Sequence, residues 1–167
     1  MGRVRRMKFG KLPAWAVALL LGAVALARAV ERQSAPPAAF AVVERAVDGD
    51  TVVLAGGERV RYIGIDTPEL HHPRKPVQPY AREAMEFNRR LVEGKKVRLE
   101  TDVNRRDKYG RLLAYVYLED GRFVNAELLK EGYAQLLTIP PNVRHVDLFV
   151  SLQKEAREAK RGLWGKH

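Results

Sequence analysis

Residues 39–69 read AFAVVERAVDGDTVVLAGGERVRYIGIDTPE, and this stretch decides the fold. Strand-forming residues fill Ala39–Val47, Thr51–Leu54 and Glu58–Ile65. The pair Gly56-Gly57 between the last two segments is typical of a tight hairpin turn. Three strands in succession exclude a regular alternating βαβ sheet and favour a small antiparallel barrel.

The segments that follow add one inserted helix and two more strands. Apolar residues recur at helical spacing in Tyr80–Glu93, and Gly94 is well placed to end that helix. Lys96–Thr101 and Leu112–Leu118 have the composition of strands. The predicted buried face of the helix consists of Ala81, Ala84, Met85, Leu91 and Val92.

Two further helices are predicted towards the C-terminus. Asn125–Glu131 is short, with Asn125 as its N-cap, and Val146–Lys160 is longer. The fold class expected from these elements is α+β and mainly β: a five-stranded OB-fold Greek-key barrel with about three packed helices. The buried stripe of the last helix is predicted to consist of Phe149, Leu152, Ala156 and Ala159.

The beginning of the chain has the pattern of an export signal. A basic segment, residues 1–11, precedes the mostly apolar run Leu12–Ala27, and Ala27-Arg28-Ala29 resembles a cleavage site between small residues. Residues 1–29 are therefore expected to be a signal peptide or, as the alternative, an N-terminal anchor that associates with the membrane through residues 12–27. Either fate would export the rest of the chain, as a secreted or envelope-associated protein.

The remainder is a linker, residues 30–38, followed by one domain, residues 39–167. The absence of cysteine excludes disulfides, thiolate metal sites and a cysteine nucleophile. The net charge of +10 includes six basic residues that precede the first acidic residue, Glu31, and without residues 1–29 it is +4. A domain of this mild charge is compatible with a polyanionic ligand but does not require one.

Candidate metal ligands lie in two acidic motifs, Asp48-Gly49-Asp50-Thr51 and Ile65-Asp66-Thr67-Pro68-Glu69. In an extended backbone Asp48 and Asp50 would point to the same side and repel each other unless a cation lay between them. Asp66 ends a strand beside free backbone carbonyls, an arrangement that suits a hard cation such as calcium or magnesium. Both motifs are also common turn sequences, which is the simpler interpretation of each one alone.

Glu69, Arg61 and Arg111 are candidates for the chemistry of phosphodiester cleavage. Glu69 follows Asp66 by three residues, a spacing that would let it orient a metal-bound water. A guanidinium matches phosphate oxygens and stabilises charge that grows in a transition state. The adjacent His71 and His72 are interpreted as solvated loop residues rather than zinc ligands, because neighbours in sequence rarely converge on one ion.

The spacing of Arg61 and Asp66 sets a geometric condition. Residues five apart in an uninterrupted strand lie on opposite faces. They share a site only if the strand bends, and Gly64 lies between them. We therefore predict a bend or bulge near Gly64.

Together with Asp107-Lys108-Tyr109-Gly110-Arg111, the two acidic motifs resemble, in order and spacing, those of the staphylococcal (micrococcal) nuclease family. The resemblance covers roughly residues 40–166. It implies an OB-fold barrel that hydrolyses DNA and RNA with calcium and gives mainly 3'-phosphorylated products. The calcium ligands that it implies are the carboxylates of Asp50 and Asp66 and the carbonyl of Thr67, with Asp48 just outside the ligand shell.

The same resemblance implies the remaining roles. Arg61, Glu69 and Arg111 would be catalytic, and Lys108 and Tyr109 would contact a neighbouring phosphate of the substrate. The segment Leu137–Pro141 departs from the family pattern, because it lacks the tyrosines that contact the nucleotide. Stacking on one base is worth about 1–3 kcal/mol, so we expect weaker substrate binding or a different base preference.

The sequence thus favours an exported, calcium-dependent nuclease that acts as a monomer and prefers single-stranded DNA or RNA. The alternatives are a non-catalytic OB module that binds nucleic acid at the cell envelope, and an envelope protein that uses the barrel for protein contacts. The presence of Asp50, Asp66 and Glu69 favours the enzyme.

Overall fold

The structure is a computed structural model that describes residues 40–70 and 76–165. The expected signal peptide or anchor, the linker, and His71 and His72 lie outside these residues, and the interpretations of them stay predictions. Within the two described ranges, no helix is long and apolar enough to cross a membrane.

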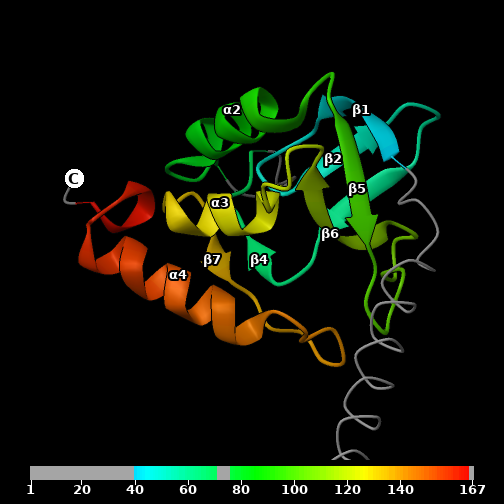
Figure 1. The fold of residues 1–167 in the computed structure, drawn as a ribbon. Coiled ribbons are helices and arrows are strands. Elements are labelled where there is room, and N and C mark those ends of the chain that lie inside the picture. Colours follow the sequence, from blue (N-terminus) through cyan, green and yellow to red (C-terminus); the bar gives the residue numbers. More distant parts are fainter. Residues whose placement is uncertain (1–39, 71–75, 166–167) are drawn as a thin grey trace, which may run out of the picture. The chain divides into compact units, whose positions relative to one another are not determined.

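Five strands close into a barrel in the order β1-β2-β3-β6-β5 (Figure 1). All of its neighbouring strands are antiparallel except β3 and β6, where Arg61 lies beside Leu113 in a parallel register. The small antiparallel barrel favoured by the sequence therefore has one parallel seam. The chain leaves β3, passes through helix α2 and strand β5, and returns along β6 in the direction of β3. The strands are β1 (Phe40–Ala46), β2 (Thr51–Leu54), β3 (Arg59–Tyr62), β5 (Lys96–Glu100) and β6 (Leu112–Leu118).

Alternation along β3 shows how the sequence builds both the barrel core and the site. Val60 and Tyr62 point inward and are buried, whereas Arg59 and Arg61 lie on the outer face. Valines fill many of the inward positions, and each buried valine contributes about 1.5–3 kcal/mol relative to exposure. The fully buried valines of the five barrel strands are Val43, Val52, Val60, Val97 and Val116.

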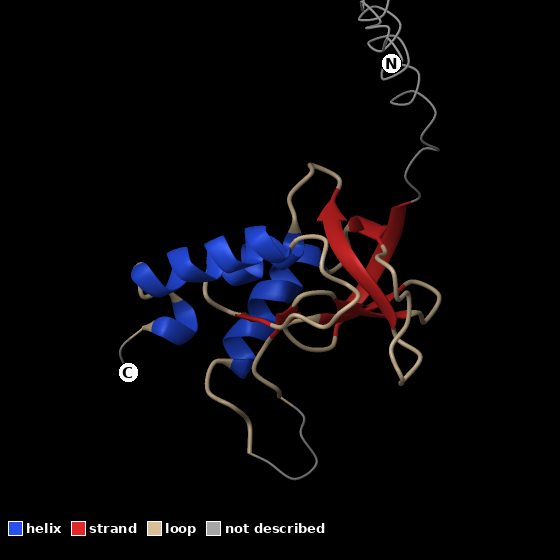
Figure 2. Cartoon of the chain, turned by 90° about the horizontal axis from the view of Figure 1, so that it is seen from below, coloured by secondary structure: helices blue, strands red, loops and turns tan. Residues whose placement is uncertain are grey.

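Three helices group on one side of the barrel (Figure 2), which confirms the predicted fold class. α2 spans Ala81–Val92, α3 spans Val124–Lys130 and α4 spans Val146–Glu158, and a short 3-10 turn follows at Gly162–Trp164. Ala81, Ala84, Leu91 and Val92 are buried as predicted, and Met85 is half-buried.

Two details of the helix predictions are wrong. Asn125 is not an N-cap: α3 begins one residue earlier, and the buried Asn125 amide accepts a bond from the N–H of Val116 (3.0 Å) and donates one to the carbonyl of Ile63 (2.9 Å). The Asn125 side chain therefore makes hydrogen bonds to residues distant in sequence instead of capping its own helix. α4 ends at Glu158, so the exposed Ala159 lies past its last turn and outside the buried stripe.

The predicted bend at Gly64 is present. The strand expected over Glu58–Ile65 stops at Tyr62, Gly64 has φ 81°, and a short strand β4 (Ile65–Asp66) follows in a new direction. A Cβ at Gly64 would lie 2.5 Å from the ring of Phe149, so close approach as well as backbone conformation requires glycine there.

A two-residue strand that the sequence did not predict, β7 (Gln135–Leu136), pairs with β4 beside α3 (Figure 1). The N–H of Leu137 adds a bond to the carbonyl of Gly64 (3.0 Å). This small sheet attaches the chain that enters α4 to the strand end that holds Asp66.

Candidate active site

The two acidic motifs meet at the guanidinium of Arg61. Its Nη1 lies 2.8 Å from Oδ2 of Asp50, and its Nη2 lies 2.8 Å from Oδ1 of Asp66. Nη1 also donates to the carbonyls of Tyr62 (3.2 Å) and Ile65 (2.9 Å). Four acceptors therefore hold the side chain of Arg61, which alternation along β3 directs outward. Two of the four, the carbonyl of Ile65 and the carboxylate of Asp66, come directly after the bend at Gly64.

Asp48, Gly49 and Asp50 form a turn rather than the extended segment considered from the sequence. The carboxylate of Asp48 accepts the N–H of Asp50 (3.1 Å), and the N–H of Val47 bonds to the carbonyl of Thr51 (2.9 Å). A Cβ at Gly49 would lie 2.7 Å from the side chain of Thr67, so glycine lets the two motifs touch. The turn interpretation and the functional interpretation of this motif are therefore compatible.

Asp50 is buried, with 4% of its surface exposed, and its Oδ2 accepts the N–H of Thr67 (2.8 Å). Burial raises the pKa of Asp50 to about 7, and the charge of Asp48 adds to this effect, although Arg61 and the Thr67 N–H act against it. A nearby cation favours the ionised form of a buried carboxylate and so lowers its pKa. Asp66 is more accessible, with 56% of its side chain exposed.

The donor set fits a hard divalent cation. One guanidinium reaches both carboxylates, so Asp50 and Asp66 stand close enough to share a single positive group. Carboxylate and carbonyl oxygens are the ligands that calcium prefers. Among the described residues, no three His, Cys, Asp or Glu side chains are placed around one metal position.

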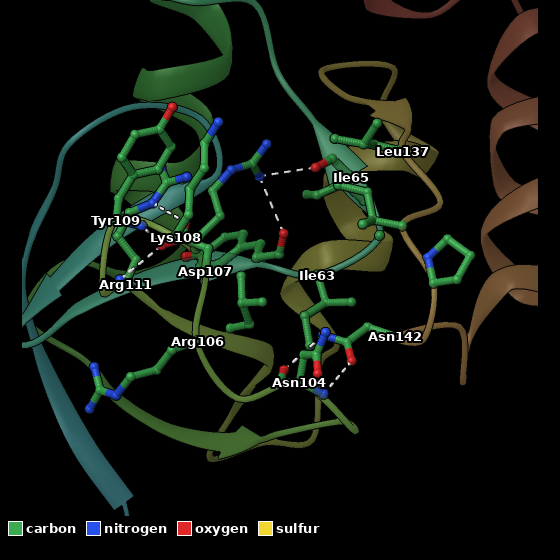
Figure 3. A pocket seen from close by; sticks show the side chains of 16 residues that line it. Ile63, Ile65, Asn104, Arg106, Asp107, Lys108, Tyr109, Arg111, Leu137 and Asn142 are labelled. Carbon is green, nitrogen blue, oxygen red and sulfur yellow. Dashed lines mark hydrogen bonds and ion pairs between the residues drawn. The ribbon is translucent and has the colours of Figure 1, made fainter.

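Beside these acids lies a cavity of about 450 Å³, whose lining includes Arg61 and Arg111 (Figure 3). Asp107 positions Arg111, because its Oδ2 accepts Nε (2.7 Å) and its Oδ1 accepts the backbone N–H (3.0 Å). Burial of Asp107 acts against ionisation, but the bonds from Arg111 and from the N–H of Tyr109 hold the pKa of Asp107 below its ordinary value. Arg111 is thus fixed at the cavity edge by a charged partner.

Lys108 and Tyr109 lie on the same side of the cavity as Arg111, whereas Ile65 and Leu137 lie on the other (Figure 3). Tyr109 is 72% exposed, with the Lys108 ammonium 5.0 Å and the Arg111 Cζ 5.5 Å from its ring centroid. The opposite wall is largely apolar and includes Leu137, Ile139 and Pro140. The cavity therefore has one cationic side and one apolar side.

Glu69 stands apart from the residues that line this cavity. Its side chain is exposed, and its backbone is held by Gln78, whose Oε1 accepts the Glu69 N–H (3.0 Å). It lies on the loop that continues from Asp66 and Thr67, three residues beyond Asp66. The structure thus brings Asp50, Asp66 and Arg61 into direct contact, places Arg111, Lys108 and Tyr109 on the adjoining cavity, and leaves Glu69 on a neighbouring loop.

Sequence reasoning missed a buried polar network behind the site. The fully buried Asn88 accepts the hydroxyl of Tyr62 (3.0 Å) and donates to the carbonyl of Asp48 (2.9 Å). It ties α2 to the turn that holds Asp50. An asparagine on the apolar stripe of a helix was the one signal in the sequence that pointed to it.

A family model described as staphylococcal nuclease homologue matches residues 59–166. The chain is 44% identical over 126 residues to the thermonuclease of Staphylococcus intermedius, which is 74% of each chain. It is 42% identical over 125 residues to the thermonuclease of Staphylococcus hyicus, 73% of each chain. It is 46% identical over 129 residues to endonuclease YncB of Bacillus subtilis, 74% of this chain and 61% of that protein.

Proposed function

This chain belongs to the staphylococcal nuclease family, and from that premise we propose that it is an exported, calcium-dependent nuclease. That it is a nuclease follows from the similarity to thermonucleases and endonucleases. The observation that supports the finer proposal is the meeting of Asp50, Asp66 and Arg61 at one edge of a cavity that also holds Arg111.

Asp50 and Asp66 would hold calcium through carboxylate oxygens, and Thr67 would add its carbonyl, with Asp48 supporting the turn from outside. A bound divalent cation neutralises phosphate charge and lowers the pKa of a coordinated water. Because a carboxylate must be ionised to hold a cation, the raised pKa of the buried Asp50 would make calcium binding stronger as the pH rises through about 7.

Arg61 and Arg111 would bind the scissile phosphate. Each guanidinium is already oriented, Arg61 by two carbonyls and two carboxylates and Arg111 by Asp107. A preorganised donor stabilises the charge that develops on the phosphoryl oxygens without reorganising during the reaction. Glu69, on the exposed loop after Thr67, would orient the attacking water, and Lys108 and Tyr109 would contact a neighbouring phosphate.

We further propose that single-stranded or frayed DNA and RNA are preferred, because a site at a barrel surface reaches an exposed backbone most easily. Products would be mainly 3'-phosphorylated, and the protein would act as a monomer outside the cytoplasm, secreted or retained by residues 12–27.

The test is incubation of the purified protein with denatured DNA and with RNA, in calcium and in chelator, from neutral to alkaline pH. We expect cleavage in calcium only, with product ends that a 3'-phosphatase modifies. Binding without cleavage at any pH would instead indicate the non-catalytic nucleic-acid-binding module. Mass spectrometry of the mature N-terminus distinguishes cleavage after residue 29 from retention of the anchor.

A further inference from the structure

A second groove adjoins the candidate active site on the far side of Tyr109. It has a volume of about 370 Å³ and lies between the β2–β3 hairpin, residues 56–59, and the turn at 109–111. Tyr109 and Arg111 line both this groove and the active-site cavity, so together they form a ridge between the two hollows.

The strand register places a further cation in this groove. Arg59 and Arg61 lie two residues apart on the outer face of β3, one pleat repeat or about 6–7 Å along the strand. In the parallel seam Val60 lies beside Leu112, so Arg59 is next to Arg111 where the ladder begins. Arg61 therefore lies on the active-site cavity, Arg59 on the second groove and Arg111 on both, close together on one face of the barrel.

Arg59 is exposed, and its side chain makes no hydrogen bond or ion pair with any other residue in the described part of the chain. The groove's carboxylate, on Glu58, is already neutralised by a bidentate pair with Arg106 (2.9 and 3.1 Å). Nη1 of Arg106 also donates to the carbonyl of Gly110 (2.7 Å) and so braces the hairpin against the turn. The groove is thus held open with an unengaged guanidinium on one wall.

At the tip of the hairpin the groove is lined by two glycines, Gly56 and Gly57. Gly56 and Gly57 have no atom within 4 Å of the position that a Cβ would take, so a ligand backbone can approach closely there. The separation of Arg59 from Arg61 is of the same order as that of neighbouring phosphates in an extended nucleotide chain. A single strand bound at Arg61 and Arg111 would meet Arg59 next as it continues over the ridge.

We propose that this groove, with Arg59 as its cation, is an additional subsite for a backbone phosphate of single-stranded DNA or RNA, beyond the phosphates at Arg61, Arg111 and Lys108. The inference rests on the proposed nuclease function. The subsite makes substrates that extend over the hairpin bind more tightly than substrates with a single phosphodiester.

A binding measurement in chelator tests the subsite without catalysis. The full chain and its Arg59→Ala variant are titrated with a fluorescein-labelled oligothymidylate of about eight nucleotides, and anisotropy is followed over a range of salt concentrations. We expect about a three- to tenfold loss of affinity in the variant, and a slope of log K against log salt that is smaller by about 0.7, the value for one lost contact to a single strand. Arg90→Ala is the matched control, since Arg90 is exposed on α2 away from both hollows, and it should change neither quantity.

Hydrolysis in calcium then separates this subsite from the catalytic pocket. We expect Arg59→Ala to lower kcat/KM for the oligonucleotide at least threefold more than kcat/KM for a thymidine nitrophenyl phosphodiester, which cannot span the ridge. Equal losses on both substrates, or a salt slope equal to that of the unchanged protein, would overturn the subsite. Failure of the unchanged protein to hydrolyse either substrate would contradict the nuclease function instead, and the anisotropy result would still decide whether Arg59 binds phosphate.

Discussion

Nη1 of Arg61 lies 2.8 Å from Oδ2 of Asp50, a carboxylate that is buried on the far side of a turn eleven residues earlier in the chain. The same guanidinium reaches Asp66 five residues later. One side chain therefore holds together the two acids on which the calcium proposal depends, and the protonation of Asp50 reports on that arrangement.

The stability of the calcium-free protein should depend on Asp50. Because burial raises its pKa from 3.8 to about 7, folding takes up a proton between these values, so its contribution to stability is full below pH 3.8 and is lost as the pH rises through about 7. In chelator, we expect the free energy of unfolding of the unchanged protein to fall from pH 5 to pH 8 relative to that of Asp50→Asn. Urea titrations at the two pH values measure this difference, and parallel pH profiles of the two proteins would contradict it.

Asp107 should act on catalysis through Arg111. Asp107→Asn keeps an acceptor for the backbone N–H groups of Tyr109 and Arg111 but removes the charged partner of the guanidinium. We expect kcat to fall about 10- to 100-fold, as for other groups that orient a catalytic side chain, and KM to change less. Arg111→Ala should cost about 10²–10³ in kcat.

The matched control for Asp107 is Asp120→Asn. Asp120 accepts the backbone N–H (3.0 Å) and Nε (2.8 Å) of Arg122 in the same way, but at an exposed turn far along the chain from the site. A similar loss of kcat in both variants would show that the effect is not specific to Arg111.

Gly64→Ala should destabilise the fold by more than about 2 kcal/mol. The residue has φ 81°, and a Cβ would lie 2.5 and 2.8 Å from two ring atoms of Phe149. Gly94→Ala provides the control, because Gly94 has φ 72° but open space where its Cβ would go, so it should show only the backbone strain of about 1 kcal/mol. Denaturant unfolding measures both, and equal losses would show that the contact with Phe149 is unimportant.

Asn88→Ala should cost about 1–3 kcal/mol of stability, because it leaves the hydroxyl of Tyr62 and the carbonyl of Asp48 without their buried partner. Tyr62→Phe should cost less, because it removes only the bond to Asn88 and leaves the bond between Asn88 and the carbonyl of Asp48 in place. The double variant should be less destabilised than the sum of the single variants, and a double-mutant cycle measures that coupling. Strict additivity would mean that the bond between the two side chains contributes nothing.

The sequence predicted those parts of the fold that local patterns encode. The bounds of β2 and β6 follow from unbroken runs of strand-forming residues, and the bend at Gly64 follows from the odd spacing of Arg61 and Asp66. The barrel and its family could be recognised because three motifs occur in order.

Features that depend on long-range contacts could not be predicted. β7 has two residues and no periodicity, so it exists only because β4 lies beside it. Asn125 has the composition of a cap but bonds to Ile63 and Val116, which are distant in sequence. The clamp between Glu58 and Arg106 joins residues 48 apart, and nothing local in the sequence indicates that they meet.

The apolar side of the cavity, residues 137–141, is held at both ends by hydrogen bonds. Leu137 bonds to Gly64 at one end, and at the other the Asn142 amide makes two 2.8 Å bonds with the backbone of Asn104. Neither attachment involves the side chains that face the cavity. We therefore expect that exchanging residues 137–141 for sequences of equal length would alter nucleobase selectivity and leave phosphodiester cleavage unchanged.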